Sequence, residues 1–249
     1  MDSIVFIKRV PDSAAKITVG GDGKSIEQAG VDYVISPYDE IALECAIQLK
    51  EAHGGTVTVV CLGFADATKE IRQALAMGAD TAVLVKDEGG SRGPLGIAKA
   101  LTGSLDGKSY DALFFGRQSI DADNSAVGVM VAEMLDLPAI TCVTKLEVAD
   151  GVATAHRESE AGTEVIEVKL PAVFTAQRGL AEPRYPAIKG IMMAKKKPIE
   201  ELDAPAPAGT LSLDKLTPPA ERTGGKIVGE GADAVPELVR LLRSEAKVL

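Results

Sequence analysis

The chain has 249 residues, of which 46% are hydrophobic and 25% charged, enough to bury one large α/β domain with appendages or two small domains. A formal net charge of −9, 4% aromatic residues and no tryptophan exclude a nucleic-acid binder with a basic face and base-stacking side chains. No apolar run reaches membrane-spanning length, and the N-terminus enters a strand directly. We therefore expect no membrane insertion and a cytoplasmic location.

Cysteine and histidine are sparse and scattered. Cys45, Cys61 and Cys142 lack C-x-x-C spacing, and His53 and His156 are far apart in sequence. This pattern is typical of reduced core cysteines and predicts neither a disulfide framework nor a metal site. No nucleophile stands beside a general base, which argues against a hydrolase or a transferase.

The first two thirds of the chain alternate strand and helix patterns. In the first helix, apolar residues recur at helical spacing from Ile41 to Leu49, and Gly54-Gly55 ends it. This alternation predicts a mostly parallel sheet covered on both faces. The predicted strands are 3–7, 56–62, 81–85 and 112–115, and the helices are 39–50, 66–77, 94–101 and 125–135.

After Leu137-Pro138 the pattern changes. Short runs at 145–148, 152–156 and 165–169 predict antiparallel strands, and 171–175 a final core strand. From Pro198 onward periodicity is lost, and 203–209 is Ala/Pro-rich. The chain closes on an amphipathic helix over 235–243. These observations predict a domain over 1–197 and a C-terminal arm over 198–249.

The segment from Leu113 to Gly128 carries the strongest functional signal. Its strand stops at Gly116, a polar loop follows, and a helix is expected to open near Asp123. Backbone N–H groups of residues 124–127 can hold phosphate oxygens at such a helix start. An ordinary capped helix remains the alternative, since Asp121 and Asp123 would repel phosphate unless they point away.

Two glycine-rich nucleotide-binding motifs, the P-loop and the dinucleotide fingerprint, are not matched by this sequence. Gly20-Gly-Asp-Gly-Lys-Ser25 resembles a P-loop, but the motif requires glycine where Thr18 stands. A hairpin turn between 16–19 and the following residues explains it better. The dinucleotide fingerprint G-x-G-x-x-G is missing after the first strand, where residues 8–12 read Lys-Arg-Val-Pro-Asp.

Residues 182–191 mix proline, glycine and apolar side chains and precede the lysines of 195–197. This composition is typical of a protruding contact loop, although a solvated segment would look similar. Arg157-Glu158 has two interpretations that the sequence does not separate: a charged pair on a surface strand, or a charged contact at an interface.

Five stretches together resemble the beta subunit of electron-transfer flavoproteins over essentially the whole chain. They are Lys8-Arg-Val-Pro-Asp12, Ser36-Pro-Tyr-Asp-Glu-Ile-Ala-Leu-Glu44, Ala74-Leu-Ala-Met-Gly-Ala-Asp80, Gly116-Arg-Gln-Ser-Ile-Asp121, and Glu182-Pro-Arg-Tyr185 with Ile191-Met192 and Lys195-Lys-Lys197. Each stretch alone is weak evidence, but five in the family's order are specific.

The resemblance implies a Rossmann-like parallel sheet of the adenine-nucleotide alpha-hydrolase type. It also implies a non-catalytic half of a heterodimer, in which the alpha subunit holds most of the FAD and the C-terminal arm packs on that subunit. The beta subunit would bind AMP in a structural role. The matching AMP-binding positions are Phe6, Lys8, Ser36, Pro37, Tyr38, Asp39, Leu62, Gly63, Gly116, Gln118, Asp121, Asp123, Asn124, Ser125, Ala126 and Val127.

The resemblance further implies a recognition loop at about 182–197. Ile188 would anchor into a partner dehydrogenase, such as an acyl-CoA dehydrogenase, with Arg184, Tyr185, Lys195 and Lys196 around it. Electrons would pass on to a quinone reductase or another acceptor. Tyr38, Arg157 and Glu158 match positions near the flavin or the subunit interface, whereas Ser13 replaces an aromatic found near the flavin in vertebrate members.

Two alternatives remain at this stage. An electron-bifurcating branch of the family holds FAD in the beta subunit, and Asp121-Ala-Asp-Asn-Ser-Ala-Val-Gly128 matches neither branch cleanly, whereas Ser91–Ala98 resembles the AMP type. The second alternative is a homodimeric nucleotide-sensing protein of the same fold, which would need no alpha subunit.

Overall fold

The computed structural model describes residues 1–249 except 88–91, 208–211 and 221–223. The chain divides into two compact units, Met1–Lys215 and Leu216–Leu249. The sequence placed the boundary after residue 197. The difference arises because the residues that follow Pro198 form a strand of the first unit.

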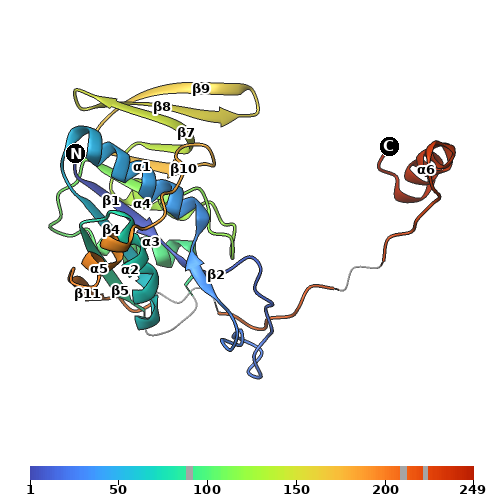
Figure 1. The fold of residues 1–249 in the computed structure, drawn as a ribbon, viewed down its shortest axis with the longest axis horizontal. Coiled ribbons are helices and arrows are strands. Elements are labelled where there is room, and N and C mark those ends of the chain that lie inside the picture. The colour runs from blue at the N-terminus through green and yellow to red at the C-terminus, as the bar shows by residue number, and fades with distance from the viewer. Residues whose placement is uncertain (88–91, 208–211, 221–223) are drawn as a thin grey trace. The chain divides into compact units, whose positions relative to one another are not determined.

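The first unit is built on a nine-stranded sheet (Figure 1), counted over the described residues. Its members are β1 (Ser3–Ile7), β4 (Val57–Gly63), β5 (Thr81–Lys86), β6 (Ala112–Gly116), β7 (Ala139–Ala149), β8 (Val152–Ser159), β9 (Gly162–Lys169), β10 (Ala172–Ala176) and β11 (Ile199–Asp203). The spatial order is β11-β5-β4-β1-β6-β10-β7-β8-β9. The strands from β11 to the start of β7 run parallel, and β8 and β9 add antiparallel.

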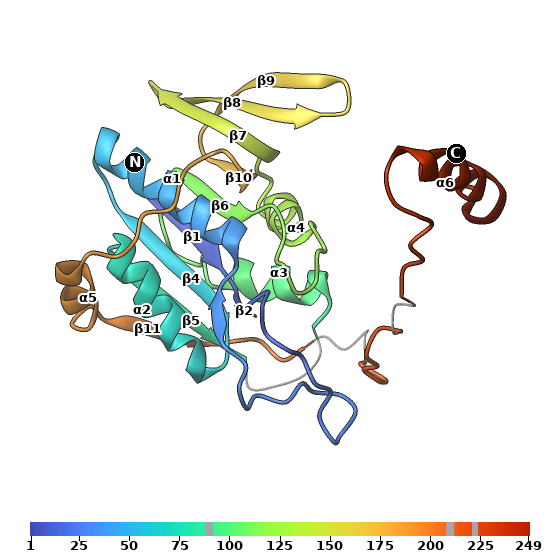
Figure 2. The ribbon, with the colours of Figure 1, turned by 45° about the vertical axis from the view of Figure 1, so that its right-hand side comes forward.

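Helices cover both faces of the parallel part, as Figure 2 shows. Central strands such as β1 and β10 are buried at every position, which is why their sequences are continuous apolar runs. One core lies under α1 (Pro37–His53), α2 (Thr68–Met77) and α5 (Ile188–Ala194). The second core lies under α3 (Pro94–Gly103) and α4 (Val127–Met134).

The structure confirms the expected α/β class. It differs from the sequence prediction in individual strands whose sequences have a weak strand pattern. Strand β11 was missed, because Ile199-Glu-Glu-Leu-Asp203 is polar and pairs on one side only, with β5. Strand β7 begins at Ala139 rather than residue 145, since its first residues pair with β10 and its later ones with β8.

A small two-stranded antiparallel sheet joins β2 (Arg9–Pro11) to β3 (Tyr33–Ile35). Between them the expected hairpin turns at Gly20–Gly23, closed by one bridge between Val19 and Ile26. Neither β2 nor β3 was anticipated, because three-residue strands carry little periodicity.

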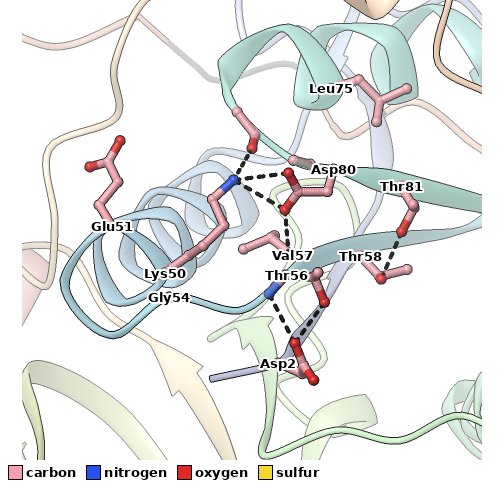
Figure 3. Close-up of polar contacts among 12 residues, drawn as sticks. Asp2, Lys50, Glu51, Gly54, Thr56, Val57, Thr58, Leu75, Asp80 and Thr81 are labelled. Carbon is pink, nitrogen blue, oxygen red and sulfur yellow. Dashed lines mark hydrogen bonds and ion pairs between the residues drawn. The ribbon is translucent and has the colours of Figure 1, made fainter.

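Polar contacts fix the amino-terminal ends of the strands (Figure 3). The Lys50 ammonium donates to the Gly78 carbonyl at 2.8 Å and to the Asp80 carboxylate, which also accepts the Val57 N–H at 2.8 Å. Asp2 accepts from both the N–H and the hydroxyl of Thr56. These bonds hold α1, α2 and β4 together at the end of the sheet where the parallel strands begin, opposite their carboxyl ends.

The second unit contains α6 (Val235–Leu241), continued by a wider π-helical turn over Leu242–Ala246. The helix predicted over 235–243 is therefore present. Pro236 lies in its first turn, where a missing N–H costs nothing, and Val235 and Leu238 are exposed.

Candidate functional site

The carboxyl ends of β1 and β6 form the switch point of the sheet. From β1 the chain moves to β4 and β5 on one side, and it then returns to β6 on the other. Ligands bind in the crevice that such a reversal opens. A cavity of about 140 Å³ lies here, lined by Phe6, Ile7, Lys8, Asp39, Leu62, Ile97, Leu101, Phe115, Gly116, Arg117, Gln118, Ser119, Asn124, Ser125, Ala126, Val127 and Gly128.

Asp39, in the first turn of α1, joins the two strand ends. Its carboxylate accepts the Lys8 N–H at 2.8 Å and the Gly116 N–H at 2.9 Å. Burial raises the pKa of Asp39 to about 7, and these two hydrogen bonds oppose the rise. The carboxylate therefore fixes the spacing between β1 and β6 at the cavity mouth.

Gly116 is required by this close approach. A Cβ at this position would lie 2.7 Å from Tyr38 Cβ and 2.8 Å from the Asp39 nitrogen. Any side chain would push α1 away from β6. Gly116 thus ends the strand where the N-terminus of α1 crosses it.

The cavity has an apolar, aromatic wall. The rings of Phe6 and Phe115 stack with centroids 4.3 Å apart and planes 9° from parallel. Leu62 and Ile97 line the same cavity. A flat apolar wall of this kind can pack against an adenine or another planar ring.

The polar end of the cavity is the start of α4. The helix begins at Val127, not near Asp123 as the sequence predicted, because Asp123 and Ser125 have left-handed backbone conformations with φ of 49° and 50°. No side chain caps the first turn. Its N–H groups are therefore available to an anion, and the dipole favours one.

Both aspartates of the loop are engaged by neighbours. Asp121 pairs with the Lys8 ammonium at 2.7 Å, and Asp123 accepts the Gln118 amide at 2.7 Å. Neither lines the cavity. The loop can therefore face a phosphate without presenting these carboxylates to it.

The structure brings ten of the sixteen expected AMP positions to the cavity wall and places the others around it. Ser36, Pro37 and Tyr38 form the start of α1 and do not line it; Gly63 and Asp121 line a neighbouring hollow, and Asp123 lies in the loop. The sequence missed Ile7, Ile97, Leu101, Phe115 and Gly128. Arg117 and Ser119, which also line the cavity, lie within the Gly116–Val127 stretch that the family resemblance aligns with the site. The pairing of β1 with β6 would have revealed Phe115, since it places this ring beside Phe6.

A larger hollow of about 870 Å³ adjoins the cavity and shares Lys8, Leu62 and Ile97 with it. Its wall includes Ser13 and the β2–β3 region. Arg9 is held there by Asp66 at 3.0 Å and stacks over Tyr33 at 3.5 Å. The two hollows together extend the space available to a ligand.

The 182–197 segment is held at its start by Arg184. The guanidinium contacts the buried Glu44 carboxylate at 2.8 Å and Glu51 at 2.6 Å, both on α1. Hydrogen bonds to Glu51 and Glu44 raise the pKa of Arg184. Arg184 was expected among partner-recognition residues, but the structure assigns its guanidinium to these contacts within the chain.

The end of the segment is held by α2. Arg72 donates to the Ala194 carbonyl at 2.6 Å and to the Lys197 carbonyl. Lys197 in turn donates to the Ala79 carbonyl beyond α2, and burial lowers its pKa. The segment is thus anchored at both ends.

Between these anchors the segment presents apolar side chains to solvent. Tyr185 is 96% exposed, Ile188 80% and Met192 65%. Ile191 and Met193 are also exposed, as are Lys195 and Lys196. An exposed apolar cluster on a fixed support is typical of an interaction site.

The other two residues expected near the flavin or an interface lie on β8. Arg157 pairs with Glu164 on β9 at 2.6 Å and donates to Thr141 on β7. Glu158 is exposed. Arg157 therefore stabilises the antiparallel strands β7, β8 and β9, whether or not it also contacts a partner.

Fold and crevice define a doubly wound α/β protein with a cavity at the switch point of its sheet. A family model described as "Electron transfer flavoprotein domain" matches residues 24–207. The chain belongs to the electron transfer flavoprotein family.

Three relatives, each named "Electron transfer flavoprotein subunit beta", show how far the similarity extends. The protein of Bacillus subtilis is 42% identical over the full length of both chains. That of Syntrophomonas wolfei is 40% identical over 98% of this chain and 97% of its own. The mouse protein is 36% identical over 95% of this chain and 96% of its own.

Two kinds of feature are absent from the residues that the structure describes. None of the helices there combines the length and apolarity needed to cross a membrane. The same part of the chain holds no group of three or more His, Cys, Asp or Glu side chains arranged to bind a metal ion.

Proposed function

We propose that this chain is the docking subunit of a heterodimeric electron carrier. It binds AMP at the switch point and pairs with an alpha subunit that holds most of the FAD. It receives the electron-donating dehydrogenase, an acyl-CoA dehydrogenase or a related flavin enzyme, on the 182–197 segment. Electrons leave toward a quinone reductase or another acceptor.

The observation that carries this proposal is the fixed, exposed 182–197 segment. Anchors at Arg184 and Lys197 hold its ends, while Ile188 projects into solvent. A rigid apolar anchor loses little conformational entropy on binding. The FAD of the carrier can then move between donor and acceptor while the docking point stays fixed.

Ile188→Ala tests docking. In the heterodimer, we expect transfer from an acyl-CoA dehydrogenase at limiting carrier to fall about tenfold, as loss of a small hot-spot side chain does, with FAD content unchanged. Leu95→Ala is the matched control, because Leu95 is half exposed on α3, on the other face of the sheet. Equal rates for the two variants would refute the docking role.

AMP fits the residues present at the cavity. The Phe6–Phe115 wall suits adenine, and the uncapped start of α4 suits a phosphate. Asp39 is the single acidic residue among the lining side chains, and both strand ends already donate to it. AMP would brace β1, β6 and α4 together and supply no redox chemistry.

FAD in this subunit is the second candidate. The adjoining hollow of about 870 Å³ favours it, because a dinucleotide needs more room than AMP. Identification of the nucleotides released from the denatured heterodimer separates the two candidates.

A further inference from the structure

Helix α5 turns one face to α2 and the opposite face to solvent. Gly190 lies against α2 (Figure 2), where the Ala76 carbonyl leaves no room for a Cβ. Successive residues of an α-helix are about 100° apart, so the residues two positions before and after Gly190 point to the other side. They are Ile188 and Met192, whose side chains are 80% and 65% exposed. The contact with α2 therefore fixes which side chains the segment presents.

Met192 is the neighbour of Ile188 on this exposed face. Residues four positions apart on a helix lie side by side on its surface, so a partner that covers Ile188 also covers Met192. The thioether of a methionine is flexible and apolar, and it adds contact area to such a surface. Oxidation to the sulfoxide makes the same side chain polar.

Met192 has the largest exposed fraction among the six methionines of the chain. Met193 follows at 52% and Met134 at 37%, whereas Met77 is 5% exposed. Met193 is five positions from Ile188 and so lies on a different face of α5. Exposure therefore favours oxidation of Met192, and the helix geometry places that oxidation beside Ile188.

Two of the three cysteines compete poorly for an oxidant. Cys45 and Cys61 are buried, and burial raises the pKa of each thiol to about 12. The thiolate is the reactive form of cysteine, so these two side chains stay inert. Cys142 is partly exposed, and a thiol reductant controls for it in the experiment below.

We propose that Met192 is an oxidation site whose sulfoxide weakens docking of the electron donor. Hydrogen peroxide supplies the oxygen atom: an S–O bond forms as the O–O bond breaks, and the departing hydroxide takes up a proton and leaves as water. The sulfur loses two electrons, which the peroxide gains. A methionine sulfoxide reductase reverses the change with electrons from a dithiol.

The site follows from the exposure of Met192 alone, whereas its effect on transfer rests on the proposed docking function. A sulfoxide that is buried in the contact without a hydrogen bond opposes binding, as any unpaired polar group does. Ile188 itself stays unchanged. Oxidation should therefore raise the apparent KM for the carrier and leave its FAD content intact.

The test exposes the assembled heterodimer to dilute hydrogen peroxide. Peptide mass mapping locates the added oxygen atoms, and a purified acyl-CoA dehydrogenase measures electron transfer at limiting carrier. We expect Met192 to be oxidised before Met134, and transfer to fall about tenfold as Met192 is converted. Methionine sulfoxide reductase should restore transfer. Dithiothreitol alone, which reduces oxidised thiols, should not.

Leucine variants show which sulfur is responsible, each compared with its own untreated rate. Met192→Leu keeps the apolar volume without the sulfur, so peroxide should leave its rate unchanged. Met193→Leu and Met134→Leu are the matched controls and should lose as much transfer as the native carrier. Equal losses in Met192→Leu and in the controls, or oxidation of Met192 no faster than that of Met134, would overturn the proposal.

Selective oxidation of Met192 with undiminished transfer would also overturn the proposed effect. Ile188→Ala then separates the two claims. If this variant still lowers transfer, the docking function stands and only the effect of oxidation fails. If Ile188→Ala is silent as well, the docking function fails too.

Discussion

Arg184 holds the buried carboxylate of Glu44 through Nε at 2.9 Å and Nη2 at 2.8 Å, joining the 182–197 segment to the middle of α1. Only 3% of the Glu44 side chain is exposed. A buried carboxylate needs such a partner. The contact therefore stabilises the fold and at the same time positions the exposed segment.

Arg184→Ala should lower the free energy of unfolding by about 2 kcal/mol, because it leaves Glu44 buried without its partner. Urea denaturation measures this change. Arg184→Ala/Glu44→Gln removes the stranded charge and should recover part of the stability, while electron transfer from the dehydrogenase stays low because the segment is loose. Full recovery of transfer in the double variant would contradict a positioning role.

Asp39→Asn should destabilise the protein by about 2 kcal/mol, since an amide accepts through only one of its two polar atoms and leaves the N–H of Lys8 or Gly116 unpaired. The pH dependence gives a second readout. The pKa of Asp39 is raised to about 7 in the fold, so this group binds more protons in the folded than in the unfolded state. Its contribution to the free energy of unfolding therefore decreases as the pH rises from about 4 to about 7.

Asparagine has no such titration. The stability difference between native protein and Asp39→Asn should therefore be larger at pH 5 than at pH 8 in urea denaturation. A difference that grows toward pH 8 would show that the ionised form is the one the fold prefers.

Gly116→Ala should separate α1 from β6, because the added methyl would overlap Tyr38 and Asp39. We expect a loss of about 2 kcal/mol, typical of overpacking, together with reduced nucleotide content. Gly21→Ala is the control, since no atom lies within 4 Å of a Cβ there. Thermal unfolding compares the two, and equal midpoints would refute the close approach.

Lys8→Met should reduce bound AMP without lowering stability. The Lys8–Asp121 pair is about one third exposed on each side, and such pairs contribute under about 1 kcal/mol. Losing the cation leaves Asp121 free to repel a phosphate. Lys145→Met breaks the exposed pair with Glu147 and should leave AMP content intact; an equal loss of AMP in both variants would contradict the account.

Much of the parallel sheet was predictable, because strands buried on both faces are continuous apolar runs between glycine-terminated helices. The edge strand β11 was not, since one-sided pairing needs no apolar pattern. The start of α4 was misplaced because left-handed Asp123 and Ser125 look like ordinary capping residues in sequence. The role of Arg184 was hidden because its partner Glu44 lies far away in the chain.

The most direct test of the account is the nucleotide content of the heterodimer. The chain is co-expressed with its alpha subunit, purified and denatured, and the released nucleotides are identified and counted. The account predicts one FAD and one AMP per heterodimer. Two FAD, or a chain that is stable alone and binds nucleotide without an alpha subunit, would contradict it.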